Sequence, residues 1–312
     1  MFVSLLIVGC GGGGGDNPSE VQFKTISAGG FHSLALSNNG KVYAAGYNEY
    51  GQLGLGDNTN RNAFTEVASL SGKNITALSA GYEHSLALSN SGKVYATGWN
   101  NYGQLGLGDN TDRNAFTEVT DLSGKNIIAL SAGIYRSLAL SSNGKVYATG
   151  RNHYGQLGLG DNTNTNTFKE VTDLSGITAI FAGGNYSFAI SNDGKVYATG
   201  RNNYGQLGLD NNDNKNTFTD VTSLSGKTIT ALSASDEHSF AISNDGKVYA
   251  TGRNNYGQLG SGDNTDCDAF AEVSSLSGKT IIAIAVGYEH SLALSSDRKI
   301  YATGDNYSGQ LG

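Results

Sequence analysis

The chain has 312 residues, of which 45 are glycine and 1 is proline, and charged residues make up only 15%. Its formal net charge of −7 gives no general attraction to nucleic acid or anionic lipid, so no nucleic-acid partner is expected. The 17 tyrosines and 11 phenylalanines argue against a disordered chain. Two cysteines, Cys10 and Cys267, are too few for a disulfide framework, and Cys267 is interpreted as an incidental thiol in a polar loop.

Residues 1–20 have the composition of an export signal and a tether. An apolar run from Phe2 to Val8 is followed by Gly9, Cys10 and five glycines. The run is too short to span a bilayer as a helix, and its order resembles a bacterial lipoprotein signal, in which a small residue precedes the lipidated cysteine. We therefore expect a lipid anchor at Cys10 and a location at the membrane of the bacterial cell envelope.

One feature departs from such a signal, because no Lys or Arg precedes the apolar run. The expectation is that the natural start lies upstream of Met1. The alternative is an incidental cysteine in a poorly ordered N-terminal segment.

Residues 21–312 form one domain in which a unit is repeated six times. In the second copy, Ile75–Gly81, His84–Ser89 and Lys93–Gly98 are β-compatible segments, and Phe116–Val119 follows a long polar loop as a short outer strand. Four antiparallel strands per unit, repeated radially, predict an all-β propeller; a β-helix has shorter repeats. The Gly-Gln-Leu-Gly sequence that marks each copy begins at Gly51, Gly103, Gly155, Gly205, Gly257 and Gly309.

The last copy differs from the others because it stops at Gly309–Gly312. All five earlier copies continue into a loop and an outer Phe-x-x-Val strand. The sequence therefore predicts that the sixth blade lacks a strand, and we expect the coding sequence to continue downstream.

The repeat resembles that of the regulator of chromosome condensation family. The motifs A-G-x-x-H-S-L-A-L and G-x-N-x-x-G-Q-L-G, seen in full at Ala80–Asp109, carry the resemblance, which extends from about Val21 to Gly312. This family implies a propeller, usually of seven blades, and its founding activity is nucleotide exchange on a small GTPase. Only six units are visible in this chain.

Nothing in the sequence indicates catalysis or a metal site. Four histidines recur at one repeat position, where Arg136 and Tyr186 stand in the other two copies. These substitutions favour a structural donor that bonds the backbone of its own blade over a metal ligand. The Gly-Asp-Asn-Thr loops lack the glycine and distal glutamate of a calcium loop, so Asx-turns are predicted there. The histidines are His32, His84, His238 and His290.

Variation between the copies points to one face of the propeller as a binding surface. The loop from the first to the second strand and the loop from the third to the fourth emerge on the same side of a blade, and both change from copy to copy, whereas the hairpins on the opposite face barely change. Aromatic and arginine side chains are typical of interface hot spots. The alternative is sequence drift at exposed turns. The candidate partner-binding residues are Phe31, Tyr47, Tyr82, Glu83, Trp99, Tyr135, Arg151, Arg201, Asp236, Glu237, Arg253, Tyr288 and Glu289.

These patterns favour a non-enzymatic, lipid-anchored propeller that binds a protein or peptide partner and needs no cofactor. A second hypothesis, an exchange factor for a small GTPase, rests on the family resemblance. An export signal and the absence of a distinct loop insertion argue against it. A third is a secreted hydrolase inhibitor built on the same fold.

Overall fold

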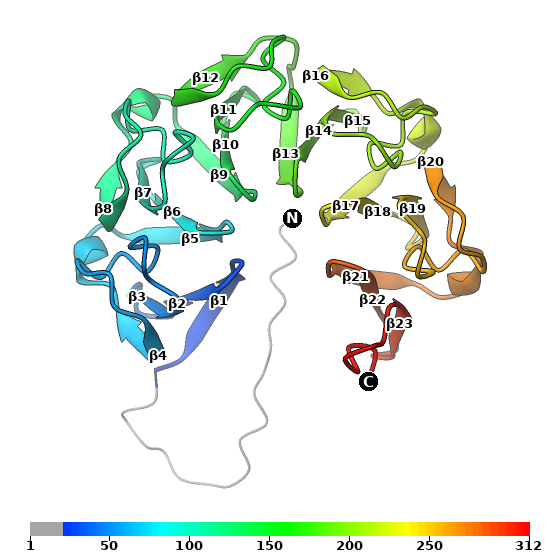
Figure 1. Cartoon of the computed structure of the whole chain (residues 1–312), viewed down its shortest axis with the longest axis horizontal. Helices are drawn as coiled ribbons and strands as arrows, with labels where there is room; N and C mark the ends of the chain where they lie inside the picture. The colour runs from blue at the N-terminus through cyan, green and yellow to red at the C-terminus, as the bar shows by residue number, and fades with distance from the viewer. Residues whose placement is uncertain (1–20) are drawn as a thin grey trace, which may run out of the picture.

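The computed structural model describes residues 21–312, which form six β-sheets arranged radially in an arc (Figure 1). The predictions for residues 1–20, including lipidation of Cys10, lie outside the described residues. Five sheets have four strands and the last has three, in the order of the chain. The predicted all-β propeller with an incomplete sixth blade is therefore confirmed.

Each blade places its first strand nearest the centre of the arc and its last strand on the outside (Figure 1). The strands of blades one to three are β1 (Phe23–Ala28), β2 (His32–Ser37), β3 (Val42–Gly46), β4 (Arg61–Glu66), β5 (Ile75–Ala80), β6 (His84–Ser89), β7 (Val94–Gly98), β8 (Arg113–Glu118), β9 (Ile127–Ala132), β10 (Arg136–Ser141), β11 (Val146–Gly150) and β12 (Thr165–Val171). The strands of blades four to six are β13 (Ile177–Ala182), β14 (Tyr186–Ser191), β15 (Val196–Gly200), β16 (Lys215–Asp220), β17 (Ile229–Ala234), β18 (His238–Ser243), β19 (Val248–Gly252), β20 (Cys267–Glu272), β21 (Ile281–Val286), β22 (His290–Ser295) and β23 (Ile300–Gly304).

The outer strands differ most from the sequence prediction. In blade two the outer strand β8 begins at Arg113, three residues before the predicted start, because Gly98 pairs with Arg113 across a register shift. Cys267 consequently opens strand β20 rather than lying in a loop, and its thiol is free. One-turn 3-10 helices follow four of the outer strands, at η1 (Ala68–Leu70), η2 (Thr120–Leu122), η3 (Thr222–Leu224) and η4 (Ser274–Leu276).

The hydrophobic core is divided into clusters that lie between consecutive blades. In β6 the alternating residues separate: Leu86 and Leu88 join the cluster shared with blade three, whereas Ala87 joins the cluster shared with blade one. Both faces of each internal sheet are thus buried, and small Ala and Ser residues let the sheets approach closely. The blades are held together by stacking rather than by a common central core.

The repeated histidines connect neighbouring blades. His32 Nε2 lies 2.7 Å from Ser85 Oγ in blade two, and His84 Nε2 lies 3.0 Å from Ser137 Oγ in blade three. The structural role expected of these histidines is confirmed. The predicted hydrogen bond to the backbone of the same blade is wrong for their Nε2 atoms, which contact a serine of the next blade instead. The ring is long enough to cross the narrow space between the sheets and reach a serine 53 residues further along the chain.

The other residue types at this position make the same connection. The buried Arg136 donates from Nε to Ser187 Oγ of blade four, 3.0 Å away, and its terminal nitrogens donate to backbone carbonyls of that blade. Tyr186 Oη lies 2.8 Å from Ser239 Oγ of blade five. Burial lowers the pKa of Arg136 to about 9, so the guanidinium is still charged at neutral pH.

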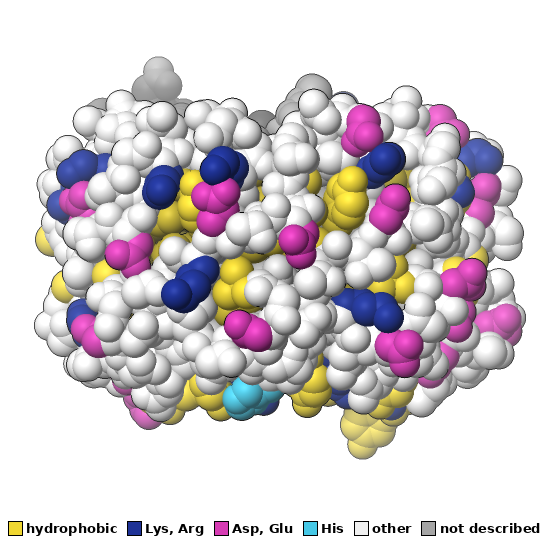
Figure 2. Space-filling model, turned by 90° about the horizontal axis from the view of Figure 1, so that it is seen from above, with side chains coloured by type: hydrophobic (Ala, Val, Ile, Leu, Met, Phe, Trp, Pro, Cys, Tyr) yellow, Lys and Arg dark blue, Asp and Glu magenta, His cyan; other side chains and the backbone are white. Residues whose placement is uncertain are grey.

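The outer wall of the propeller carries repeated ion pairs. A lysine of the hairpin between the second and third strands meets a glutamate of the outer strand in four blades, for example at 3.0 Å between Lys93 and Glu118 and at 2.7 Å between Lys145 and Glu170. Figure 2 shows this wall edge-on, with basic and acidic side chains side by side on a largely neutral surface. Such exposed pairs each contribute little to stability.

Acidification is expected to destabilise the propeller between about pH 6.5 and pH 4. Burial lowers the pKa of His32 and His238 to about 4 and that of His84 to about 3, from an ordinary value of 6.5. In this window the unfolded chain binds more protons than the folded chain. The free energy of unfolding therefore decreases as the pH is lowered. At pH 5 it is lower than at neutral pH by about 2 kcal/mol per histidine.

Urea denaturation at a series of pH values measures this effect. His84→Gln should reduce the pH dependence by about a third, on the same linkage argument. The exposed His153 provides a matched control, since His153→Gln should leave the profile unchanged. A free energy of unfolding that is constant from pH 7 to pH 5 would contradict the prediction.

Candidate protein-binding face

The loops of the candidate face are held in place by buried amide side chains. In blade two the buried Asn100 accepts from the Leu105 N–H at 2.9 Å and donates to the Asp109 and Thr111 carbonyls at 2.9 and 3.1 Å. Gln104 Oε1 accepts from the Tyr102 N–H at 3.1 Å. The recurrence of N-x-Y-G-Q-L-G is thereby explained, because these residues fix the loop on the blade.

The Gly-Asp-Asn-Thr loops form the predicted Asx-turns. In blade one the Thr59 N–H donates to Asp57 Oδ1 at 2.9 Å, and in blade two the Thr111 N–H donates to Asp109 Oδ1 at 2.9 Å. Arg61 and Arg113 pair with these aspartates at 2.6 Å. Within residues 21–312 no group of three or more His, Cys, Asp or Glu residues has the geometry of a metal site.

The two variable positions of each blade are joined by a backbone hydrogen bond. The Trp99 N–H donates to the Glu83 carbonyl at 2.9 Å, and the Arg151 N–H donates to the Tyr135 carbonyl at 2.9 Å. The same bond joins Arg253 to Glu237 at 2.8 Å. Both variable loops therefore lie together on one face, as the strand topology predicts, and we call this the loop face.

Aromatic side chains from blades one to three form a continuous cluster on the loop face, the aromatic patch. Trp99 lies 4.9 Å from Tyr135 and 5.4 Å from Tyr102 between ring centroids, mostly in edge-to-face geometry. Edge-to-face pairs are the favoured arrangement of aromatic rings. The patch consists of Phe31, Tyr47, Tyr50, Tyr82, Trp99, Tyr102 and Tyr135, each within 6.1 Å of another member.

Arginines continue the patch into the later blades by stacking on tyrosines. The Arg151 guanidinium lies 5.3 Å from the Tyr102 ring centroid and 5.7 Å from that of Tyr135. Arg201 lies 5.6 Å from Tyr204, which also contacts the Arg253 guanidinium at 5.4 Å. Arginine and aromatic side chains thus alternate around the face through cation–π contacts.

An acidic residue closes this series in blade five. Glu237, whose side chain is 11% exposed, pairs with Arg253 at 2.6 Å and with Arg201 at 3.5 Å. Its hydrogen bond raises the pKa of Arg253. Glu289 of blade six lies 3.8 Å from Arg253. We call Arg201, Glu237, Arg253 and Glu289 the arginine–glutamate cluster.

Neighbouring groups alter the ionisation of several residues on this face. A hydrogen bond from its phenol to Glu49, together with nearby acids, raises the pKa of Tyr47 to about 12. Burial raises the pKa of Glu83 and of Asp236, and the latter also lies near Glu237. These acids would bind a cationic group without first losing a full shell of water.

The structure brings most of the predicted residues into these two clusters. Phe31, Tyr47, Tyr82, Trp99 and Tyr135 lie in the aromatic patch. Tyr288 stands apart, 62% exposed, although it occupies the same repeat position as Tyr82. Blade six has Asp305 at the repeat position of Trp99, so this position supplies no aromatic ring beside Tyr288.

The sequence prediction missed the tyrosine of N-x-Y-G-Q-L-G, which occurs in the first five copies and is Ser308 in the sixth. Tyr50, Tyr102, Tyr154 and Tyr204 form the floor on which the variable residues pack. Because they recur, variation between the copies does not single them out. Their large aromatic side chains on a polar loop were a signal that could have identified them.

The matching family model is the regulator of chromosome condensation (RCC1) repeat. One form of this model matches residues 39–88, 91–140, 143–190, 193–242 and 245–294, and a second matches six segments from residue 23 to residue 310. This chain belongs to the RCC1 repeat family.

Individual relatives agree with this assignment. The chain is 36% identical over 288 residues to the ultraviolet-B receptor UVR8 of Arabidopsis thaliana, and the match covers 92% of the chain. It covers 54% of that receptor, so the chain spans about half the length of this relative. It is also 31% identical to human E3 ubiquitin-protein ligase HERC2, but the match covers only 5% of that protein.

Solved structures share the fold. Human WBSCR16 superposes with a TM-score of 0.79 at 25% identity, covering 90% of this chain and 73% of that one. Yeast RCC1 (Prp20), solved with Kap60 bound, superposes with a TM-score of 0.80 at 23% identity, covering 91% and 70%. No helix within residues 21–312 is long and apolar enough to cross a membrane.

The fluorescence of Trp99 is expected to report on the aromatic patch. It is the one tryptophan of the sequence, and Tyr135 covers one side of its indole. Tyr135→Ala should expose the indole to water, shift its emission to longer wavelength and change the free energy of unfolding by no more than about 2 kcal/mol.

Steady-state emission spectra provide the measurement. Tyr256→Ala is the matched control, because Tyr256 is an exposed tyrosine of blade five and makes no aromatic contact in the described part of the chain. A spectrum unchanged by Tyr135→Ala would show that Trp99 does not belong to the patch in solution.

Proposed function

We propose that this chain is a non-enzymatic propeller that binds a protein or peptide partner through its loop face. The observation that carries the proposal is the continuous surface made by the aromatic patch and the arginine–glutamate cluster. Aromatic and arginine residues dominate the energetics of protein interfaces, and here they are gathered on one side of a rigid scaffold. The hairpins of the opposite face are short, polar and nearly identical.

The two clusters define the chemistry of the partner. The aromatic patch suits an apolar or aromatic segment, and its members have already lost much of their rotamer freedom by packing on one another. The neighbouring cluster presents Arg201, Arg253, Glu237 and Glu289, which suit a segment carrying both an acid and a base. A partner that spans both clusters has an apolar stretch followed by mixed charges.

Named relatives support a binding role in general terms. The relative from Arabidopsis thaliana is a receptor. Yeast Prp20 has been solved with Kap60 bound and has been studied for its binding to Gsp1p and histones. These partners are named for the relatives only and are not assigned to this chain.

Photo-crosslinking from the loop face tests the proposal. A benzophenone side chain at Tyr82 should capture a partner from cells that make the protein, whereas the same group at the exposed Asn90 of the opposite hairpin should not. The triple change Tyr82→Ala, Trp99→Ala and Tyr135→Ala should weaken binding of that partner by about 100-fold or more, since three central contacts are removed.

The outcomes separate the hypotheses. Equal capture from Asn90, or full binding by a folded triple variant, would contradict the proposal. Capture of a small GTPase would instead favour the exchange-factor hypothesis.

We also propose that the chain is anchored to the bacterial cell envelope by a lipid on Cys10. The support is the sequence Leu6-Ile7-Val8-Gly9-Cys10 followed by a glycine tether. Metabolic labelling with palmitate should mark the wild-type chain, and Cys10→Ala should abolish the label and release the protein from membranes. The matched control is Cys267→Ala, which should retain both. Label that persists in Cys10→Ala would contradict the anchor.

A further inference from the structure

Asn39 and Asn143 are the two asparagines of the sequence that precede a glycine, and both occupy the same position of a hairpin. The hairpins join the second and third strands of blades one and three, on the face opposite the loop face. Both side chains are exposed. An asparagine in this setting is prone to lose its side-chain amide, because glycine has no side chain to shield its own backbone nitrogen from the asparagine carbonyl.

The asparagine side chain is folded back over the hairpin by hydrogen bonds to its oxygen. In blade one, Ser37 Oγ and the Lys41 N–H both donate to Asn39 Oδ1, the latter at 3.3 Å. In blade three, Ser141 Oγ donates to Asn143 Oδ1 at 2.6 Å. Such donors stabilise the negative charge that develops on Oδ1 when a nucleophile adds to the side-chain carbonyl.

Aspartate occupies the same position in blades four and five without a change of the hairpin. Ser191 Oγ donates to Asp193 Oδ1, and Ser243 Oγ donates to Asp245 Oδ1. These hydrogen bonds lower the pKa of both carboxyl groups. The product of amide loss therefore fits this turn, because two blades are built with it.

Each hairpin must open before an asparagine can react. The attacking atom is the backbone nitrogen of the glycine, whose N–H donates to a carbonyl three residues earlier. The two bonds, from Gly40 to Ser37 and from Gly144 to Ser141, are both 3.0 Å long. What differs between the blades is the packing on the tip of the hairpin, which sets the free energy of local opening.

The segment that leads to blade four covers the hairpin tip of blade three. The Ile177 N–H donates to the Gly144 carbonyl at 3.1 Å. A Cβ on Gly144 would lie 2.9 Å from the Gly176 Cα, so the two backbones are in close contact. Opening this hairpin breaks the bond to Ile177 as well as its own bonds.

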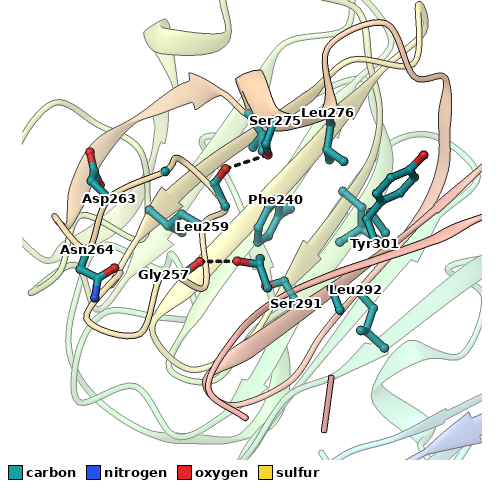
Figure 3. A pocket seen from close by; sticks show the side chains of 17 residues that line it. Phe240, Gly257, Leu259, Asp263, Asn264, Ser275, Leu276, Ser291, Leu292 and Tyr301 are labelled. Atoms are coloured by element: carbon teal, nitrogen blue, oxygen red, sulfur yellow. Dashed lines mark hydrogen bonds between the residues drawn. The ribbon is translucent and has the colours of Figure 1, made fainter. Parts of the chain in front are cut away.

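Blade five has the same cover, and the covering segment is itself fixed. The Ile281 N–H donates to the Gly246 carbonyl at 3.1 Å, and a Cβ on Gly246 would lie 2.7 Å from the Thr280 side chain. Earlier in this segment, Ser275 donates to the Gly260 carbonyl at 2.9 Å (Figure 3). A covered tip is therefore held against a part of the chain that is anchored on its own blade.

The hairpin tip of blade one lacks this cover. Apart from its chain neighbours, no atom of residues 21–312 lies within 4 Å of the place of a Cβ on Gly40. The Ile75 N–H, the counterpart of Ile177, makes no bond to Gly40. The hairpin of blade one therefore opens at a lower cost in free energy than the hairpin of blade three.

We propose that Asn39 is a site of spontaneous deamidation in the folded protein, and that the cover on Gly144 protects Asn143 from the same reaction. The Gly40 nitrogen loses its proton to solvent and bonds to Asn39 Cγ. The bond from Cγ to Nδ2 breaks, and ammonia leaves with a proton from solvent. Water then adds at Cγ and opens the five-membered imide, which returns a proton to the Gly40 nitrogen and leaves aspartate. One water enters and one ammonia leaves, so no oxidant or reductant is needed.

The reaction adds a charge to the hairpin face without changing the fold. The formal net charge of −7 becomes more negative by one unit for each converted asparagine. The new carboxylate lies two residues before Lys41, which already pairs with Glu66 at 2.8 Å. In blade six the corresponding residues, Asp297 and Lys299, pair at 2.9 Å. This site lies opposite the loop face and does not depend on its function.

Mass spectrometry of the 312-residue protein, aged in mildly alkaline buffer at physiological temperature, tests the proposal. Trypsin releases Asn39 in residues 25–41 and Asn143 in residues 137–145, and fragment spectra assign a gain of one mass unit to a residue. In the folded protein Asn39 should convert at least about tenfold faster than Asn143, since its hairpin opens more readily. In urea the two should convert at similar rates, because the cover on Gly144 is lost.

The variant Gly40→Arg provides an independent arm. Blade six already has an arginine at this repeat position, Arg298, with a φ of 67°. The variant should slow conversion of Asn39 about tenfold or more, since a side chain then shields the attacking nitrogen, and it should leave Asn143 unchanged. Equal rates for Asn39 and Asn143 in the folded protein, no conversion of Asn39, or undiminished conversion in Gly40→Arg would each overturn the proposal.

Discussion

A serine on the second strand of each following blade makes the contact on which the arrangement of the blades depends. Ser85 lies 2.7 Å from His32 Nε2 of the preceding blade and donates its own hydrogen to the Gln52 carbonyl of that blade, also at 2.7 Å. Because the hydroxyl hydrogen is used on the carbonyl, the ring must supply the proton of the first bond. The ring therefore carries a proton on Nε2. Burial lowers the pKa of His32 to about 4, so the ring is neutral at pH 7.

This contact also positions the loop face. Gln52 belongs to the loop that carries Tyr50, and its side-chain oxygen accepts from the Tyr50 N–H at 3.2 Å. The backbone of the same glutamine is held by Ser85, so the orientation of each loop is set partly by the next blade. The variable residues therefore lie on a backbone that is already fixed, which would lower the entropy cost of binding a partner there. The aromatic patch and the arginine–glutamate cluster are different side chains on one repeated framework.

The strands of each blade could be predicted from local periodicity. The contacts between blades could not, because they join residues far apart in the sequence. Turn residues and alternating strands determine β6 and β7 within a few residues, because the hairpin needs only local contacts. The partner of His32 lies 53 residues away, and its identity depends on how two sheets stack. The reason that Arg136 and Tyr186 replace histidine is clear only in the structure, where all three types reach the same serine position of the next blade. Arg136 donates to Ser187, whereas Tyr186 accepts from Ser239 and donates its own hydrogen to the His238 carbonyl.

The prediction of the face relied on variation between the copies, so it could not include residues that recur. A tyrosine occupies the position of Tyr102 in five copies of the motif. The Tyr102 ring nevertheless packs against Trp99 and the Arg151 guanidinium on the loop face. Recurrence shows that a residue suits every blade, and a residue can suit every blade by serving as a binding platform.

The two ends of the arc differ in which half of the contact between blades they carry. His290 on the second strand of blade six meets no serine of another blade within residues 21–312, and Ser33 on the second strand of blade one meets no such ring there. Each end thus keeps one half of the contact that joins all the other blades.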